Sequence, residues 1–228
     1  IVAVDQPHHI THRGNNKQKV FRDDSDREKY LLLIEEYCIK YGSDILGYCL
    51  MPNHVHFIMI PGKEDSLAKV FNVTQMRYAQ YYNKKMGFSG HLWQGRYFSC
   101  VLDEKHLLVG LRYIEQNPIR AGLVKYPWDW NWSSASYHIG GSNKSYLTLK
   151  SLNSYINMTQ DEWKNYLSEI EKEDSIFKIR NNTRLGKPLG SEKFVMKLEE
   201  KLNKNLKFQP RGRPKRKHDK KWLLSLIC

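Results

Sequence analysis

Residues 44–60 read DILGYCLMPNHVHFIMI, and this stretch decides the fold. Its halves, Asp44–Met51 and His54–Ile60, are each short and rich in β-branched or aromatic side chains, as strands are. Between them lie Pro52 and Asn53, two residues that favour a turn. The stretch therefore predicts a β-hairpin of two antiparallel strands.

The second strand of this hairpin carries two histidines, His54 and His56, separated by one residue. Because side chains alternate between the faces of a strand, both imidazoles point the same way. The other face presents Val55, Phe57 and Met59, which can pack beneath helices. Two imidazoles on one face are a ready pair of metal ligands. Two polar residues on the open face of a sheet are the alternative, and the short pattern alone does not choose between them.

Outward from the hairpin, strand-like and helix-like patterns alternate along the chain. In chain order, the sequence predicts a strand at His9–Arg13, a helix from the Ser25/Glu28 capping box to about Tyr41, the hairpin, a helix from Ser66 to about Met86, a strand at Tyr97–Leu102, and a helix from Asp103 to Asn117-Pro118. This order matches the ferredoxin-like split βαβ plan. We therefore expect an α+β fold, an antiparallel sheet with helices packed on one face.

After the Gly-Gly pair at 140–141 the pattern changes. Thr159 with Glu162 makes a second capping box, for a helix to about Glu171, and Ser191 opens a further helix. We expect three parts, a sheet domain, a small helical C-terminal appendage and a basic flexible tail, at residues 1–141, 142–207 and 208–228.

The chain carries a formal net charge of +13, and the excess is concentrated near its C-terminus. Residues 197–221 hold eleven Lys or Arg residues against three acidic ones. Basic proteins of this size commonly bind nucleic acid or an anionic membrane surface. No basic amphipathic helix with a clean apolar face stands out, so the charge favours nucleic acid.

Neither a membrane span nor a secretory signal is visible. No run approaches the roughly 18 apolar residues that a span needs, and the first residues lack a basic region followed by an apolar one. The four cysteines are far apart and form no CxxC pair, which argues against a zinc knuckle and a disulfide framework. These patterns predict a cytoplasmic protein without membrane contact.

On the helix predicted from Asp103, Tyr113 and Asn117 are one turn apart, beside an apolar stripe. The amide oxygen of Asn117 can be the third ligand of a hard cation such as Mg²⁺. The phenol of Tyr113 then lies beside that cation and can attack a phosphate. An unselected helix tyrosine more often packs its ring on the core and leaves its hydroxyl in water.

Several segments resemble motifs of one family, and they follow its order. YIEQNPIRAGLV (113–124) resembles the catalytic-helix signature of the HUH-type single-tyrosine transposases, most closely the subgroup associated with repetitive extragenic palindromes (REP). MPNHVHFIM (51–59) is similar to that family's HUH box. HITHRGN (9–15) and LWQGRYFS (92–99) are similar to its first and pre-catalytic strands, and RLGKPLGSEKF (184–194) to a C-terminal region of many members.

The resemblance implies a prokaryotic, nucleoid-associated enzyme that cuts and rejoins single-stranded DNA next to a hairpin, such as a REP-like palindrome. Tyr113 would be the nucleophile, forming a 5′-phosphotyrosine and a free 3′-OH. His54, His56 and Asn117 would be ligands of Mg²⁺ or Mn²⁺. Many relatives outside this subgroup have Gln where Asn117 stands. The family also implies that a monomer acts with its own tyrosine or that two chains form a homodimer.

Other functions compete with this one. A domesticated descendant would bind a DNA hairpin without cutting it, although the four implied active-site residues are intact. A nuclease of plasmid transfer or rolling-circle replication is disfavoured by the match at 113–124. A histidine triad hydrolase would need a third histidine at position 58, which is isoleucine.

DNA contacts are expected from basic, polar and aromatic residues in or beside the matched motifs, namely Arg13, Asn15, Arg96, Tyr97 and Arg120. A second group lies in the tail, where Arg211-Gly212-Arg213-Pro214 resembles the core of an AT-hook and is followed by Lys215, Arg216 and Lys217. An AT-hook reads a narrow minor groove. A solvated basic tail that binds phosphates without preference is the alternative.

Overall fold

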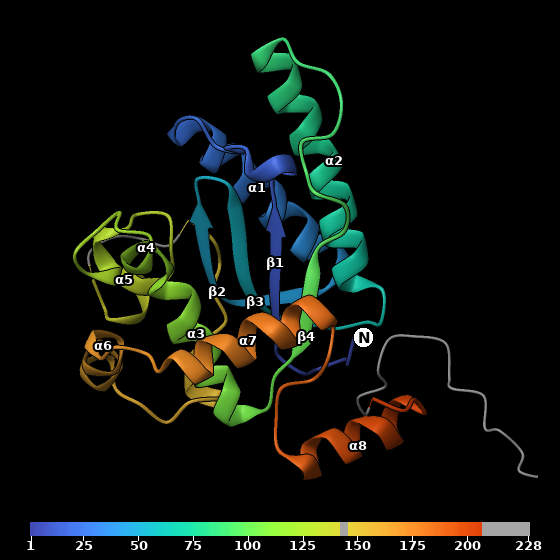
Figure 1. Cartoon of the computed structure of the whole chain (residues 1–228), viewed down its shortest axis with the longest axis vertical. Helices are drawn as coiled ribbons and strands as arrows, with labels where there is room; N and C mark the ends of the chain where they lie inside the picture. Colours follow the sequence, from blue (N-terminus) through green and yellow to red (C-terminus); the bar gives the residue numbers. More distant parts are fainter. Residues whose placement is uncertain (142–145, 207–228) are drawn as a thin grey trace, which may run out of the picture.

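The computed structural model describes residues 1–141 and 146–206 of the chain (Figure 1). Within these ranges, one four-stranded sheet has the order β2-β3-β1-β4, and its neighbouring strands all run antiparallel. The strands are β1 (His8–Arg13), β2 (Ser43–Met51), β3 (His54–Pro61) and β4 (Phe98–Val101). The predicted hairpin is confirmed as β2 and β3. The predicted α+β class and antiparallel sheet are confirmed as well.

The helices follow the predicted order through the sheet domain. They are α1 (Asp24–Tyr41), α2 (Ser66–Met86), α3 (Glu104–Glu115), α4 (Asn117–Arg120), α5 (Ala135–His138), α6 (Gln160–Ser168), α7 (Glu173–Leu185) and α8 (Glu192–Leu202). Short 3-10 helices lie at Asn15–Lys17, Pro127–Asp129 and Leu152–Ser154. None of the helices in the described ranges is long and apolar enough to cross a membrane.

The start of α1 differs from the prediction. Asp23, not Ser25, is the N-cap, and its carboxylate accepts the backbone N–H of Asp26. Lys85 of α2 pairs with Asp23 at 2.8 Å and with Asp26 at 2.7 Å. The pairing with α2 favours the earlier start, and the hydroxyl of Ser25 donates to Asp23 instead of capping the helix.

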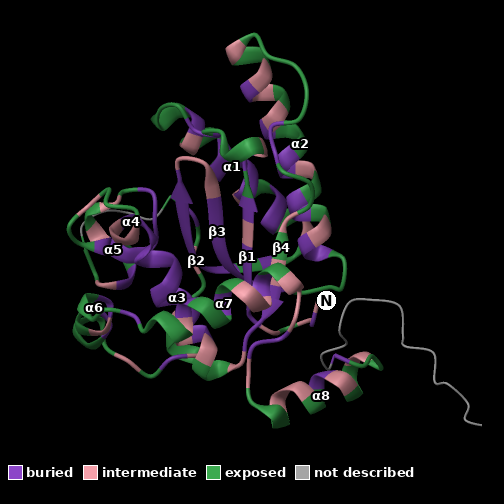
Figure 2. Ribbon diagram, in the orientation of Figure 1, coloured by how far each residue is buried: buried purple, intermediate pink, exposed green. Residues whose placement is uncertain are grey.

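Helices cover both faces of the sheet, whereas the sequence predicted helices on one face only. On the first face α1 and α2 pack against the apolar residues Val55, Phe57 and Met59, as predicted. On the second face α3 and α7 pack on a further apolar set that includes Ile58 and Ile60. Strands with apolar side chains on both faces need cover on both faces, and Figure 2 shows the strands buried along most of their length.

The segment interpreted as an appendage contributes to this second layer. Ile176 and Ile179 of α7 are buried in the same cluster as α3, and α7 packs against β4 and β1 (Figure 1). Trp163 of α6 is buried there too. The capping box of α6 and the Ser191 cap of α8 agree with the prediction, although α6 ends at Ser168. The predicted tail, with Arg211, Arg213, Lys215, Arg216 and Lys217, lies outside the described residues.

Candidate active site

The pairing of β1 with β3 sets the floor of the site. Arg13 lies opposite His54, and Thr11 lies opposite His56. Directly paired residues point to the same face of an antiparallel sheet. Both histidines therefore face α3 and α7, and β1 adds a cation and a hydroxyl beside them.

Tyr113 is held above these histidines by α3. The helix packs on the sheet through Leu107, Leu111 and Ile114, which are fully buried. The Tyr113 ring stands perpendicular to the ring of His56, with centroids 5.6 Å apart. Its own side chain is only 4% exposed. The predicted nucleophile and the predicted metal ligand therefore meet within one chain.

A cavity of about 570 Å³ opens between the sheet, α3 and α7. It is lined by His9, Thr11, Arg13, His54, His56, Gln94, Phe98, Tyr113, Asn117, Arg180, Thr183 and Arg184. The structure thus brings all four predicted active-site residues, and Arg13, to one place. Asn117 is 7% exposed, and its side-chain nitrogen has no hydrogen-bond partner among the described residues.

The sequence analysis missed several lining residues, and three of them form hydrogen bonds within the cavity. Arg180 of α7 donates from Nε to the phenol oxygen of Tyr113 at 3.3 Å. Thr183 of α7 bonds to His9 of β1 at 2.7 Å. His9 lies four residues before the predicted Arg13 on β1, so both side chains point to the same face of the strand. This spacing identifies His9 as a site residue only when β1 is known to pair with β3.

A chain of hydrogen bonds orients the two predicted ligand histidines. His54 Nδ1 lies 2.6 Å from the Asn53 side-chain oxygen. His56 Nδ1 lies 2.9 Å from His9 Nε2, and His9 Nδ1 contacts Thr183. In both predicted ligands Nδ1 forms a hydrogen bond within the protein, so Nε2 is available to another partner.

Burial keeps these imidazoles neutral at pH 7. It lowers the pKa of His9 to about 3. Burial also lowers the pKa of His54 to about 3, and the positive charges of Arg13 and Arg180 contribute. The pKa of His56 lies well below its ordinary value for the same first reason. Neutral histidines have the free lone pair that metal binding requires.

A metal site is not evident from histidine, cysteine and acidic residues alone. Within residues 1–141 and 146–206, no group of three or more such side chains is placed to hold an ion. The predicted metal ligands are two imidazole nitrogens, from His54 and His56, and one amide oxygen, from Asn117. This set contains only two residues of those types. The unpaired atom of the buried Asn117 amide is its nitrogen, which only donates, so a cation in this cavity would be bound by the amide oxygen.

Arg120 takes a supporting position. Its guanidinium lies 4.5 Å from the centroid of the Tyr113 ring and donates a hydrogen bond to the Tyr113 carbonyl oxygen. Burial lowers its pKa from the ordinary value. The side chain is half-buried against the Tyr113 ring and stabilises the end of α3.

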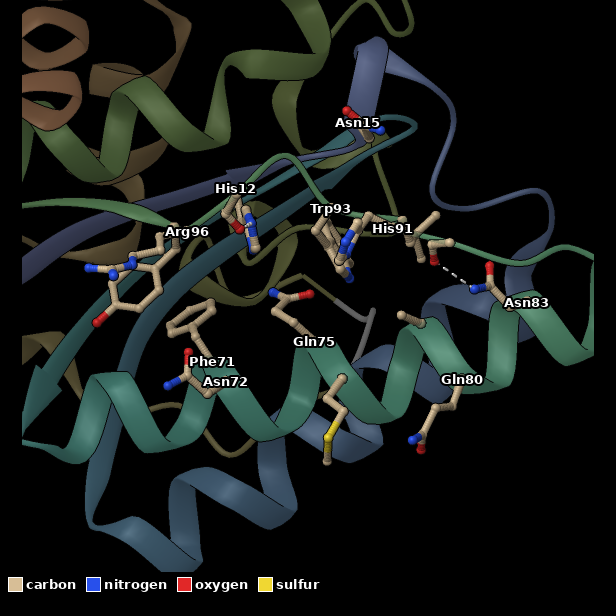
Figure 3. A pocket seen from close by; sticks show the side chains of 16 residues that line it. His12, Asn15, Phe71, Asn72, Gln75, Gln80, Asn83, His91, Trp93 and Arg96 are labelled. Carbon is tan, nitrogen blue, oxygen red and sulfur yellow. Dashed lines mark hydrogen bonds between the residues drawn. The ribbon is translucent and has the colours of Figure 1, made fainter.

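The other predicted DNA contacts of the sheet domain lie elsewhere. Asn15, Arg96 and Tyr97 line a second cavity, between α2 and the segment 90–97 (Figure 3). Arg96 is exposed, and Tyr97 packs on Phe71 with ring centroids 4.9 Å apart. The structure therefore separates the predicted contacts into two groups.

Comparison with known proteins agrees with this geometry. The family described as Transposase IS200 like matches residues 4–117. A Haemophilus influenzae protein (strain KW20 / Rd) assigned as a REP-associated tyrosine transposase is 30% identical over 112 residues, which are 44% of this chain and 63% of that protein's length. A solved structure titled as a REP-associated tyrosine transposase bound to a REP hairpin has a TM-score of 0.51 and 16% identity, over 67% of this chain and 90% of that chain. At that identity the likeness concerns the fold. Because the family match covers half of the sequence, the chain belongs to the IS200-like transposase family.

Proposed function

We propose that this protein is a metal-dependent transposase that cleaves and rejoins single-stranded DNA next to a hairpin, through a 5′-phosphotyrosine at Tyr113. One observation carries the proposal. The phenol of Tyr113, the imidazoles of His54 and His56 and the amide of Asn117 line one cavity that also holds arginines. A structure of similar fold is titled as bound to a REP hairpin, and this supports a hairpin as the substrate.

In this proposal the Tyr113 oxygen forms a bond to the scissile phosphorus. The bond to the 3′ oxygen breaks, which leaves a 5′-phosphotyrosine and a free 3′-OH. A phenol is mostly protonated at neutral pH, so its proton must leave through solvent or a local base and formally ends on the 3′ oxygen. The reverse reaction, with another 3′-OH as nucleophile, rejoins the strand without ATP.

Different residues of the cavity would bind the metal, contact the Tyr113 oxygen and bind the DNA. His54, His56 and Asn117 would hold Mg²⁺ or Mn²⁺, which when bound polarises a phosphate and offsets its developing charge. Arg180 donates a hydrogen bond to the phenol oxygen of Tyr113 and so would orient it for attack. Arg13, exposed at the end of β1, would bind the DNA backbone beside this cavity.

The hydrogen-bond chain assigns a further role to His9. If the Nδ1–H of His56 donates to His9 Nε2, the Nδ1–H of His9 donates in turn to the Thr183 hydroxyl. That tautomer leaves the lone pair of His56 Nε2 free for the cation. We therefore assign His9 and Thr183 as positioning residues.

A gel experiment tests the proposed function. Wild-type protein and a labelled hairpin with single-stranded flanks should give a Mg²⁺- or Mn²⁺-dependent cut and a covalent protein–DNA adduct. Tyr113→Phe should abolish both and leave the dissociation constant for the hairpin nearly unchanged, because the ring and its packing remain. Adduct at wild-type levels in Tyr113→Phe would exclude this nucleophile, and full cleavage in excess chelator would exclude the metal. Binding without any cut in wild type would favour the non-catalytic alternative.

A further inference from the structure

The cavity between α2 and the segment 90–97 has no part in the proposed chemistry. It measures about 690 Å³, within the range of roughly 300–1,000 Å³ that small-ligand pockets occupy. His12 of β1 lines it, while the neighbouring Arg13 lines the cavity of Tyr113. Consecutive strand residues point to opposite faces, so the two cavities lie on opposite faces of the sheet.

Three buried polar atoms of this cavity have no hydrogen-bond partner among the described residues. They are Nδ1 of His12, Oε1 of Gln75 and Nε1 of Trp93. Their side chains are 4%, 7% and 8% exposed, respectively. Figure 3 shows the Gln75 amide rising from α2 toward the rings of His12 and Trp93. Native structures seldom leave buried polar atoms unpaired, so water or a bound ligand must pair with these three.

Neighbouring bonds define what each atom offers. Gln75 donates from Nε2 to the Tyr30 hydroxyl at 2.8 Å, which leaves its carbonyl oxygen as an acceptor. His12 Nε2 lies 3.1 Å from the Gly95 carbonyl and donates to it, so Nδ1 is an acceptor. Burial lowers the pKa of His12 to about 4, and the ring is therefore neutral at pH 7. The Trp93 indole can only donate. The cavity thus presents two acceptors and one donor.

We propose that this cavity binds one unpaired guanine base of the DNA substrate. The Watson–Crick edge of guanine carries two donors, N1–H and the N2 amine, and one acceptor, O6. Among the four DNA bases this edge alone complements the two acceptors of Gln75 and His12 together with the donor of Trp93. The half-buried ring of Tyr97, which packs on Phe71, lines the same cavity and offers apolar surface to a flat base. Exposed Arg96 at its wall can bind the adjoining phosphate.

This inference rests on the proposed function, because it concerns the same DNA strand. The segment that follows α2 serves both cavities: Gln94 and Phe98 line the cavity of Tyr113, whereas Trp93 and Arg96 line the other. The segment is tied to β1 by the backbone bond from Gln94 N–H to Arg13 carbonyl at 2.8 Å. A single strand that crosses this end of the sheet can therefore place a base in one cavity and a phosphate in the other.

Binding measured without divalent metal tests the inference apart from catalysis. The probe is a labelled hairpin with four thymidines on each side of the stem, in which each thymidine in turn is replaced by dG. We expect one position to raise the affinity by about tenfold or more. Inosine at that position lacks the N2 amine and should lose most of the gain. Gln75→Met, which removes one acceptor at similar length, should also reduce the preference to less than about threefold.

Thr74→Val is the matched control. Thr74 is the preceding residue of α2, is fully buried and likewise has an unpaired oxygen, but it does not line the cavity. This variant should keep the full preference for dG. Equal affinity for all the probes would overturn the inference, and so would an unchanged dG-to-inosine ratio in Gln75→Met. In either case, tight binding of the hairpin would leave the proposed function standing. No hairpin binding at all would defeat both. If Gln75→Met fails to fold, the inosine comparison decides the question with wild-type protein.

Discussion

Replacing Arg180 by Gln tests whether α7 takes part in the chemistry. The Nε of Arg180 lies 3.3 Å from the Tyr113 phenol oxygen, and its guanidinium carbon is 5.8 Å from the ring centroid. A hydrogen bond in which one partner is charged contributes about 1.5–3 kcal/mol. This bond is long and the arginine is exposed to solvent, so we take about 1.4 kcal/mol, just below that range, as its contribution at the proposed nucleophile. That loss corresponds to a rate of adduct formation about tenfold lower.

Arg184→Gln supplies a control with the same loss of charge. Arg184 lies one turn further along α7, lines the same cavity and makes no hydrogen bond to Tyr113. Each variant should flatten the logarithmic dependence of DNA affinity on salt by about 0.7 if it loses one phosphate contact. Only Arg180→Gln should slow the chemical step.

The assay is a single-turnover reaction at saturating DNA, stopped with detergent and resolved on a denaturing gel. The rate constant of adduct formation should fall about tenfold in Arg180→Gln and less than twofold in Arg184→Gln. Equal slowing in the two variants would mean that α7 contributes only general positive charge. A wild-type rate in both would refute the role assigned to this hydrogen bond.

Two further predictions follow from contacts within one chain. Because Tyr113 meets His56 of its own chain, a monomer should suffice, and an equal mixture of Tyr113→Phe and His56→Ala should not restore adduct formation on the gel. Recovery toward about a quarter of the wild-type level would indicate exchange of helices in a homodimer, because about half of the dimers would be mixed and each of these would hold one intact site of two. The fully buried carboxylate of Glu115 bonds to the side chains of Ser134, His138 and Trp163. Glu115→Ala should lower the free energy of unfolding in urea by about 3 kcal/mol or more, since these partners lose their acceptor; a loss below about 1 kcal/mol would show that the network adds little.

Local patterns predicted the sheet domain well. The hairpin at 44–60 was predictable because alternation and turn residues coincide, and Ser66–Met86 agrees with α2 at both ends. The Asp103 cap of α3 also agrees. The start of α1 was wrong because two residues there can cap, and the choice depends on Lys85 of α2. A distant contact of this kind leaves no local signal.

The second wall of the active site was not predictable for the same reason. Helix α7 has no side-chain cap at Lys172 and buries only Ile176, Ile179 and Thr183, so its pattern is weak. Arg180 becomes a neighbour of Tyr113 only when α7 packs on the sheet. The roles of the four predicted active-site residues stay predictions, although their meeting in one cavity agrees with them.

The placement of His12 and Arg13 back to back on β1 has a consequence for divergence among transposons. Residues that would recognise a base and residues that would cut the backbone occupy different faces of one strand and share only the segment that follows α2. Substitutions on the α2 face can therefore alter which element a transposase recognises without disturbing the nucleophile. Retargeting by mutation, in nature or in the laboratory, should succeed first at α2 positions such as Asn72, Gln75 and Asn83.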